Sequence, residues 1–316
     1  MEEMMLLEKI EYSIVIPVCN EEENISKLYE KISTVMQREL KSYEILFVND
    51  GSIDNTSEVL VSLNKHDPRL RAVIFSKNFG RQMALTAGVD YARGDAVIMM
   101  DGDLQHPPEI IPELIRKHKE GYDIVYTTRT YLKNAGIFKR ISSKLFYRTM
   151  SFLGVDLNPG GTEFMLIDKV IIDCLKQARE RFRFLRGIIN WVGFKKIGVP
   201  YVAAKRYSGK TKFSAYKMIE EAFVCIFSFS SLPLYLAGYL GLIVSGVSFL
   251  YVIYALYVKL VKGIAIPGWT SVVMSVLLIG GVQLIFLGIL GAYVGRIYEE
   301  IKGRPLYIVK QKIGTE

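Results

Sequence analysis

Two aspartates stand one residue apart at the end of an apolar run. The stretch VIMMDGDLQHPPEI, residues 97–110, places Asp101 and Asp103 directly after four apolar residues. Two carboxylates this close repel each other unless a positive charge lies between them. Mg²⁺ binds one or two protein carboxylates and completes its shell with phosphate oxygens and water. The pair therefore predicts a metal site for Mg²⁺ or Mn²⁺, with a phosphorylated ligand beside it.

Acidic turns are common, so the pair alone is a weak indication of a metal site. Two other apolar runs also end in unusual polar residues. YSIVIPV is followed by Asn20 and Glu21, and YEILFV is followed by Asn49 and Asp50. If all three runs are strands of one parallel sheet, these side chains meet at its carboxyl edge, where such sheets bind ligands.

The elements that would position these residues alternate along the first half of the chain. Short apolar runs rich in Val, Ile and aromatic residues alternate with segments of helical periodicity, and the runs predict five strands, at 12–18, 43–50, 70–76, 95–101 and 123–129. This alternation favours an α/β fold, an open and mostly parallel sheet with helices on both faces. No GxGxxG follows the first run and no GxxxxGK[ST] occurs, which disfavours a dinucleotide-binding or P-loop enzyme.

The last third of the chain has a different composition. No Asp, Glu, Lys or Arg occurs between Glu221 and Lys259, or between Lys262 and Arg296. Apolar stretches of this length predict membrane-spanning helices, at about 233–258 and 269–294. Buried core helices are the alternative, but two in tandem would need a larger soluble core. The prediction is a globular domain, 1–221, followed by a membrane domain, 222–316, that ends in a tail.

The charge distribution predicts an orientation in the membrane. The link between the two apolar segments holds only Lys259 and Lys262, whereas the flanks 205–217 and 296–312 are richer in Lys and Arg. By the positive-inside rule, the globular domain and both termini lie in the cytoplasm. The net charge of +8 suits an anionic membrane surface. No basic helix or zinc-finger pattern supports nucleic-acid binding.

Two further segments are candidates for helices at the membrane interface, near 134–153 and 212–231. The first alternates basic and apolar residues on a helical period. An ordinary solvent-facing helix explains that pattern equally well, and the sequence leaves the two interpretations open.

Several stretches together resemble a known family. They are VIPVCNEEENI, FVNDGSIDNT, SKNFGRQMALTAGVDYARGDAVIMMDGDLQHPPE, RGIINWVGF, YSGKTKFS and YVGRIYEEIKGRPLYIV. The chain resembles the family-2 glycosyltransferases that load sugars onto polyprenyl phosphates, a group that includes dolichyl-phosphate mannose synthases. It is most similar to bactoprenyl glucosyltransferases of the GtrB type, with two C-terminal spans. The resemblance covers about residues 10–310 and implies a GT-A-like fold.

The resemblance implies roles for individual residues. Nucleotide-sugar binding falls to Pro17, Asn20, Glu21, Asp50, Lys77, Asp101 and Gln105. Asp101 and Asp103 hold the metal. The catalytic group comprises Asp103, Glu163 and Arg129.

Basic residues are expected to meet the phosphate of the lipid acceptor. The positions that match the family are Arg129, Arg140 and Arg206, and Lys212 is a further candidate. A phosphate brought near a diphosphate needs fixed cations beside it. An ordinary charged surface facing the membrane is the other interpretation of these residues.

The sequence departs from the family pattern at three positions. Glu163 in TEFMLIDK stands where the family has Asp, which adds one methylene to the side chain. Lys77 in KNFG replaces Arg, and Ala292 in GAY replaces Glu. The role of Glu163 in sugar binding or catalysis is therefore an open point.

The resemblance implies a membrane-bound, inverting glycosyltransferase of the plasma membrane that acts on a nucleotide sugar and a polyprenyl phosphate such as undecaprenyl phosphate. UDP-glucose is the expected donor, and UDP-N-acetylglucosamine and GDP-mannose are alternatives. A homo-oligomer, a tetramer, is also implied. A catalytically degenerate, membrane-anchored protein that binds a nucleotide sugar is the alternative from another class. A processive polysaccharide synthase is disfavoured, because no QxxRW occurs.

Overall fold

The computed structural model describes residues 9–39, 42–129, 161–202, 230–262 and 268–314. The chain divides into two compact units. The globular unit comprises Met1–Ala222 and Arg304–Glu316, and the helical unit comprises Phe223–Gly303. Each unit is described by itself.

The globular unit is built on an eight-stranded sheet in the order β7-β5-β6-β4-β1-β2-β3-β8. The strands are β1 Tyr12–Val18, β2 Tyr43–Asn49, β3 Leu70–Phe75, β4 Ala96–Met99, β5 Ile124–Arg129, β6 Gly161–Asp168, β7 Lys196–Tyr201 and β8 Val309–Ile313. Pairing is parallel along β4-β1-β2-β3 and between β5 and β7. The strands β6 and β8 pair antiparallel with their neighbours. The sheet is therefore mixed but mostly parallel, as the sequence predicts.

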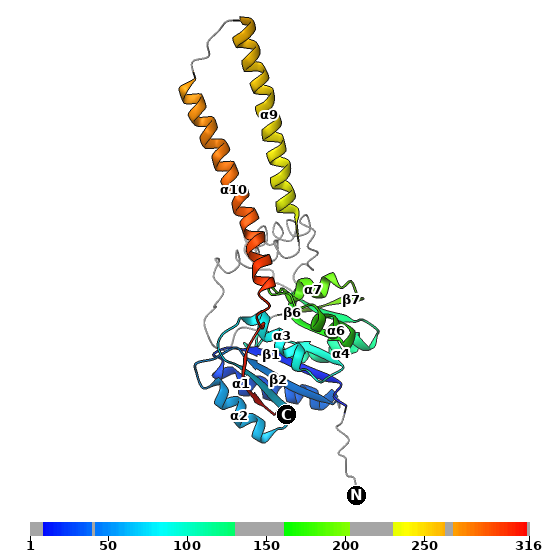
Figure 1. Ribbon diagram of the computed structural model, residues 1–316. Helices are drawn as coiled ribbons and strands as arrows, with labels where there is room; N and C mark the ends of the chain where they lie inside the picture. Colours follow the sequence, from blue (N-terminus) through cyan, green and yellow to red (C-terminus); the bar gives the residue numbers. More distant parts are fainter. Residues whose placement is uncertain (1–8, 40–41, 130–160, 203–229, 263–267, 315–316) are drawn as a thin grey trace. The chain divides into compact units, whose positions relative to one another are not determined.

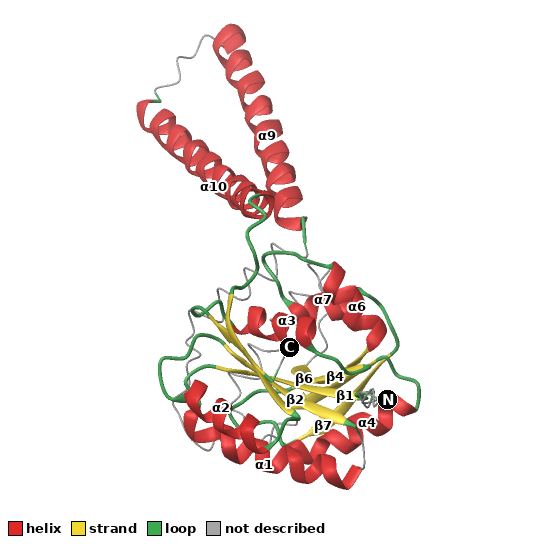
Figure 2. Cartoon of the chain, turned by 60° about the horizontal axis from the view of Figure 1, so that its bottom comes forward, coloured by secondary structure: helices red, strands yellow, loops and turns green. Residues whose placement is uncertain are grey.

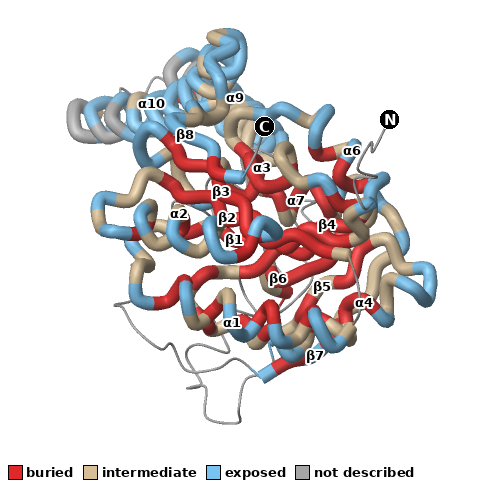
Figure 3. Tube along the Cα trace, turned by 90° about the horizontal axis from the view of Figure 1, so that it is seen from below, coloured by how far each residue is buried: buried red, intermediate tan, exposed pale blue. Residues whose placement is uncertain are grey.

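Helices cover both faces of the sheet (Figure 1). They are α1 Glu22–Glu39, α2 Thr56–His66, α3 Arg81–Tyr91, α4 Ile111–Lys119, α6 Lys169–Gln177 and α7 Leu185–Trp191. One face carries α1, α2 and α4, and the other carries α3, α6 and α7 (Figure 2). The inner strands are buried along their length between the two layers (Figure 3), which is the environment that favours continuous Val and Ile runs.

The helix α3 packs unusually close to the sheet. A Cβ added at Gly88 would lie 2.0 Å from Cγ1 of Val15 on β1. Its small residues Ala84, Ala87 and Gly88 are buried at this contact. The close packing carries the first residue of the helix, Arg81, to the carboxyl edge of the neighbouring strands.

A buried charge network lies between strands β1, β2 and β3. The guanidinium of Arg71 pairs with Glu44, which also accepts hydrogen bonds from Oγ of Ser13 at 2.5 Å and from the backbone N–H of Arg93 at 2.8 Å. Arg71 and Glu44 are 4% and 1% exposed. With both charges removed from water, each depends on the other for its stability in the fold.

The helical unit contains α9 Leu232–Lys262 and α10 Trp269–Ile301. Their apolar segments Leu232–Tyr251 and Ser271–Ile301 have mean hydropathies of 1.7 and 2.5, and no residue of these segments whose burial the structure describes is buried. Both helices are long and apolar enough to cross a membrane. The lack of burial argues against the alternative of core helices.

The structure differs from the sequence prediction at three places. Residues Arg304–Glu316, expected as a tail of the membrane domain, belong to the globular unit and supply β8. The strand predicted at 95–101 is shorter and ends at Met99. The helical segment expected after this strand begins with a 3₁₀ turn, Pro108–Ile110, before α4. The predicted interfacial helix near 134–153, and most of the one near 212–231, lie outside the described residues.

Candidate active site

The polar residues that follow the strands lie at one edge of the sheet. Strand β1 runs parallel to β2 on one side and to β4 on the other, so all three end together. Asn20, Asp50 and Asp101 follow these ends. The backbone of Asp50 donates to the carbonyl of Val18 at 2.9 Å, which joins the first two ends directly. The expected convergence of the three segments is confirmed.

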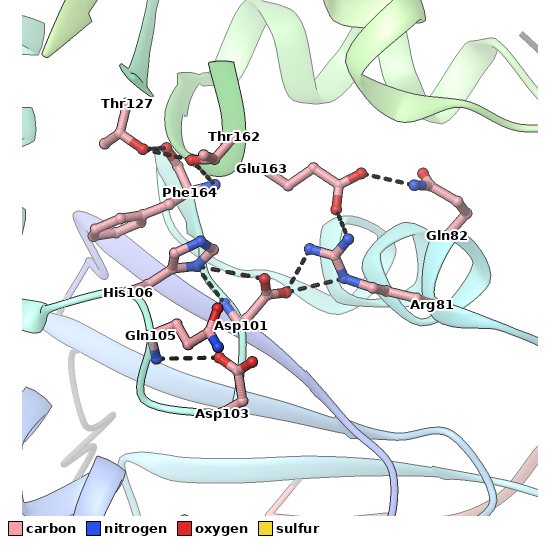
Figure 4. A network of polar contacts seen from close by, with 10 residues as sticks. All are labelled: Arg81, Gln82, Asp101, Asp103, Gln105, His106, Thr127, Thr162, Glu163 and Phe164. Atoms are coloured by element: carbon pink, nitrogen blue, oxygen red, sulfur yellow. Dashed lines mark hydrogen bonds and ion pairs between the residues drawn. The ribbon is translucent and has the colours of Figure 1, made fainter. Parts of the chain in front are cut away.

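A guanidinium lies between the carboxylates of Asp101 and Glu163 (Figure 4). Arg81 donates to Oδ1 of Asp101 through Nε at 3.0 Å and Nη2 at 2.5 Å. Its Nη1 forms an ion pair with Glu163. The first residue of α3 thus supplies a positive charge beside Asp101 in the acidic turn, Asp101–Asp103.

The strand register explains why Asp101 and Glu163 need a cation. β4 and β6 are antiparallel, with Met99 opposite Met165. Continued by two residues, this register sets Asp101 opposite Glu163, so the two carboxylates extend from neighbouring strands. Glu163 also accepts a hydrogen bond from Nε2 of Gln82 at 2.7 Å.

Gln82 connects this network to the helix on the far side of the site. Its Oε1 accepts from the backbone N–H of Leu185, the first residue of α7, at 3.1 Å. Both the nitrogen and the oxygen of the Gln82 amide are thus hydrogen-bonded, which fixes the orientation of this side chain. It holds Glu163 at a defined distance from α3.

A buried histidine, His106, fixes the backbone of the acidic turn by a hydrogen bond. Nδ1 of His106 accepts the backbone N–H of Asp101 at 3.0 Å, so the ring proton of the neutral form is on Nε2. The ring stacks on Phe164 with centroids 5.1 Å apart. Burial lowers the pKa of His106, although the charge of Asp101 opposes that shift. His106 is therefore neutral near pH 7 and positions Asp101 through its backbone.

The turn that carries Asp103 is tightly constrained. Oδ1 of Asp103 accepts the backbone N–H of Gln105 at 3.1 Å. Leu104, between them, has a φ of 60°, in the left-handed region that non-glycine residues rarely occupy. A Cβ on Gly102 would lie 2.8 Å from Cγ1 of Val18, so only glycine fits between the two aspartates. Backbone strain of this kind is concentrated at functional sites.

Asp50 is buried and holds the segment before α3. Its Oδ1 accepts from the backbone N–H of Phe79 at 2.7 Å, and its Oδ2 accepts from that of Gly80 at 3.0 Å. Burial raises the pKa of Asp50, and these two backbone donors oppose the shift. We refer to Lys77–Arg81 as the donor loop, because it joins Asp50 to Asp101 through Arg81.

The other predicted nucleotide-binding residues lie around the ends of β1 and β2. Oδ1 of Asn20 accepts from the backbone of Ile53 at 2.9 Å, and Oε2 of Glu21 accepts from Asn24 at 2.6 Å. Pro17 is in β1 itself. Nζ of Lys77 lies 5.2 Å from the ring centroid of Phe79. Asn20 and Glu21 thus brace the turns that surround Asp50, and a nucleotide role for them stays a prediction.

Arg129 is the one predicted phosphate-binding residue in the part of the chain that the structure describes. It ends β5, is exposed and lies opposite Tyr201 of β7. Burial raises the pKa of Tyr201; the positive charge of Arg129 opposes the shift, and the negative charges of Asp101 and Asp103 add to it. The other three candidates lie outside the described residues: Arg140, Arg206 and Lys212.

The oxygen ligands of the acidic turn fit Mg²⁺ or Mn²⁺. Asp101 and Asp103 offer carboxylates, the hard ligands that these ions take in ones or twos. Within the described ranges, no group of three or more His, Cys, Asp or Glu side chains is placed to hold a metal by itself. An ion bound here would therefore need further oxygens from a phosphate or water, as a phosphorylated substrate supplies.

The sequence prediction did not single out three residues of this network: Arg81, Gln82 and His106. All three occur inside the stretch SKNFGRQMALTAGVDYARGDAVIMMDGDLQHPPE that carries the family resemblance. A basic residue directly after the glycine that starts a helix was the available indication for Arg81. The pairing with Glu163, 82 positions later, depends on the strand order and cannot be deduced from spacing.

Comparison with known proteins identifies the family. Residues 13–178 match the family model Glycosyl transferase family 2. The chain is 45% identical over 97% of its length to a Bacillus subtilis (strain 168) protein named uncharacterized glycosyltransferase YkcC, of which it covers 95%.

Two further relatives carry more specific names. The SfII prophage-derived bactoprenol glucosyl transferase of Shigella flexneri is 41% identical over 95% of this chain and 97% of its own length. The prophage bactoprenol glucosyl transferase homolog of Escherichia coli (strain K12) is 40% identical over 95% and 98%. The mixed, mostly parallel sheet is GT-A-like, and the chain belongs to glycosyl transferase family 2.

Proposed function

We propose that the protein transfers glucose from UDP-glucose to the phosphate of a polyprenyl lipid, with inversion at the anomeric carbon. The observation that carries the proposal is the similarity to bactoprenol glucosyl transferases, which extends over almost the full length of both chains. It therefore includes α9 and α10, which are long and apolar enough to reach a membrane-bound acceptor. The carboxylates at the sheet edge support a diphosphate donor.

The proposed reaction is a single displacement. A phosphate oxygen of the lipid attacks the anomeric carbon and forms the new C–O bond, while the bond from that carbon to the β-phosphate oxygen breaks and UDP leaves. The second pKa of a phosphate monoester is about 6, so the group is largely ionised at neutral pH. The acceptor oxygen therefore needs no strong general base.

The residues of the site have separate tasks in this scheme. Asp101 and Asp103 would hold a divalent cation, which supplies charge neutralisation to the departing diphosphate. Arg129 is exposed at the end of β5, where it can attract the acceptor phosphate. Glu163 is held by Arg81 and Gln82 facing Asp101, and we assign it to orientation of the sugar hydroxyls.

A donor screen tests the proposal. Membranes containing the full chain are supplied with undecaprenyl phosphate, Mg²⁺ and one of three donors: UDP-glucose, UDP-N-acetylglucosamine or GDP-mannose. We expect a lipid product with UDP-glucose, identified by mass spectrometry, and a β-linked sugar by NMR from an α-linked donor. A product with another donor alone would correct the sugar, retention of configuration would refute the single displacement, and donor binding without transfer would favour the degenerate binding protein.

We also propose that the globular unit and both termini face the cytoplasm of the cell, where nucleotide sugars are made. The excess of Lys and Arg in 205–217 and 296–312 supports this orientation. Reporter fusions at each terminus and within the link 263–267 test it, because the link should report the opposite side. The proposed tetramer is checked by the mass of the detergent-solubilised protein.

A further inference from the structure

The segment that follows α10 is part of the globular unit and contacts β3 and Ser76, the residue directly before the donor loop. The stretch GRPLYIV was among the motifs of the family resemblance, but the proposed reaction gives it no task. Its continuation, β8, pairs antiparallel with β3, with Gln311 opposite Ile74 and Lys312 opposite Val73. We propose that Tyr307 in this segment is a positioning residue that holds the donor loop in the geometry needed to bind the nucleotide sugar. The inference rests on the proposed function for the identity of the ligand.

Tyr307 makes two contacts with different parts of the globular unit. Its hydroxyl donates to Oδ2 of Asp90 at 2.7 Å. Its ring stacks on Phe75, the last residue of β3, with centroids 5.0 Å apart and an interplanar angle of 14°. Burial raises the pKa of Tyr307, and the hydrogen bond to Asp90 adds to the shift. The phenol therefore remains a proton donor throughout the physiological range.

The stacking contact leads directly to the donor loop. Phe75 meets the ring of Phe79 edge-on, with centroids 5.7 Å apart. The backbone N–H of Phe79 is the closer of the two donors to Asp50. Beside this row of rings, the N–H of Ser76 donates to the carbonyl of Ile308 at 2.9 Å, so the tail also fixes the backbone that enters the loop.

The hydrogen bond leads to the same loop through α3. Asp90 is in the last turn of this helix, and Arg81 is its first residue. A rigid helix of this length spans about 15 Å, so a constraint on Asp90 limits where Arg81 can lie. Arg179 donates to both carboxylate oxygens of Asp90, at 2.8 and 2.9 Å, and completes the anchor. Tyr307 thus contacts residues on both sides of the donor loop and α3, Phe75 before them and Asp90 in the last turn of the helix.

A tail that only covers the open edge of β3 would explain the strand pairing. It would not require a tyrosine whose ring stacks on Phe75, before the donor loop, and whose hydroxyl binds Asp90, at the end of α3. The two interpretations give different results when the hydroxyl alone is removed, because Tyr307→Phe keeps the ring, the stacking and β8.

A matched control exists in the same unit. The hydroxyl of Tyr29 donates to Oδ2 of Asp67 at 2.6 Å, in a contact between α1 and the end of α2. Tyr29→Phe therefore removes the same type of hydrogen bond at a comparable distance, away from the donor loop. Tyr307→Ala serves as the stronger variant, because it removes the ring as well.

The first measurement is amide hydrogen exchange of the full chain in nanodiscs without ligand. We expect Tyr307→Phe to accelerate exchange at the N–H groups of Phe79 and Gly80 by about threefold to tenfold, with Tyr29→Phe unchanged there. Equal protection of these two groups in Tyr307→Phe and wild type would overturn the proposal.

The second measurement is UDP binding by calorimetry with Mn²⁺ present, together with KM and kcat for sugar transfer. We expect Tyr307→Phe to raise the Kd of UDP and the KM of the donor by about threefold to tenfold, with a smaller change in kcat and no change in Tyr29→Phe. The proposal would also be overturned if Tyr307→Phe and Tyr29→Phe lowered the melting temperature equally and both bound UDP like wild type. Failure of wild type to bind UDP would refute the proposed donor, and hydrogen exchange would still decide whether Tyr307 positions the loop.

Discussion

Replacement of Arg81 by glutamine separates the charge of this residue from its place in the fold. In the structure its guanidinium neutralises Asp101 and Glu163 at the same time. A divalent cation that binds Asp101 has to compete with this internal cation. We therefore expect Arg81→Gln to bind Mn²⁺ more tightly than wild type when no nucleotide is present.

The size of the effect follows from the exposure of the partners. The side chains of Arg81 and Asp101 are 41% and 28% exposed, so solvent screens their contact, while Glu163 is 13% exposed. Only the pair with Asp101 has to break when the metal binds, and an ion pair in such a setting contributes about 0.5 kcal/mol. Released to the metal, that free energy corresponds to about a twofold lower Kd for Mn²⁺.

The assay is a titration of the full chain with Mn²⁺, in which the free ion is counted by electron paramagnetic resonance. Arg69→Gln is the control, because Arg69 also pairs with a carboxylate, that of Asp67, just before β3 and outside α3 and the donor loop. Its Mn²⁺ affinity should match wild type. Weaker Mn²⁺ binding by Arg81→Gln than by wild type would refute the reasoning, since it would mean that the guanidinium assists the ion.

Three further outcomes are expected. Asp103→Asn keeps an oxygen for the N–H of Gln105, so its melting temperature should stay near wild type while the transfer rate falls about 100-fold or more in a radiolabelled-sugar assay; a normal rate at saturating Mg²⁺ would remove Asp103 from the metal site. Arg71→Met leaves Glu44 as an unpaired buried charge and should lower the free energy of unfolding in urea by about 3–5 kcal/mol. A decrease below about 1 kcal/mol, as expected for an exposed site, would contradict this reasoning. Burial opposes ionisation of Asp67, but its hydrogen bonds, chiefly from Arg69, outweigh this and lower its pKa below the usual 3.8. Its stabilising contribution is therefore complete above that value and is lost as pH falls through the lowered pKa. The gap in melting temperature between wild type and Asp67→Asn should stay constant from about pH 7 to pH 5 and narrow at lower pH, and a gap that does not change with pH would exclude the linkage.

The alternation of strands and helices could be predicted because it follows from the local spacing of apolar residues in the sequence. The buried runs that became β1, β2 and β3 are continuous Val, Ile and Leu segments between polar helices. The strand β8, VKQKI, escaped prediction for the opposite physical reason. It is a short edge strand in which four of five residues are partly or fully exposed, so no apolar run marks it. Its pairing with β3 joins residues more than 200 positions apart, which local patterns do not encode.

The site was predictable in part for similar reasons. The ends of parallel neighbouring strands must converge, which placed Asp50 and Asp101 correctly at one edge. The contact of Arg81 with Glu163 depends instead on where an antiparallel strand is inserted, and nothing in the spacing of these residues states that. The role of His106 depends on its burial against the acidic turn, which its neighbours in the sequence do not indicate.

The antiparallel course of β6 has a consequence for how the chain tolerates change. Parallel strands deliver only their final residues to the active edge, but a strand that runs the other way delivers its first ones, and Glu163 is the third residue of β6. Side chains alternate between the two faces of a strand, so one residue inserted between Glu163 and Met165 would turn the carboxylate to the far side of the sheet, whereas two would restore its direction. An insertion of an even number of residues here should therefore be tolerated and one of an odd number should not. A substitution of aspartate by glutamate changes only how far the carboxylate extends from the strand.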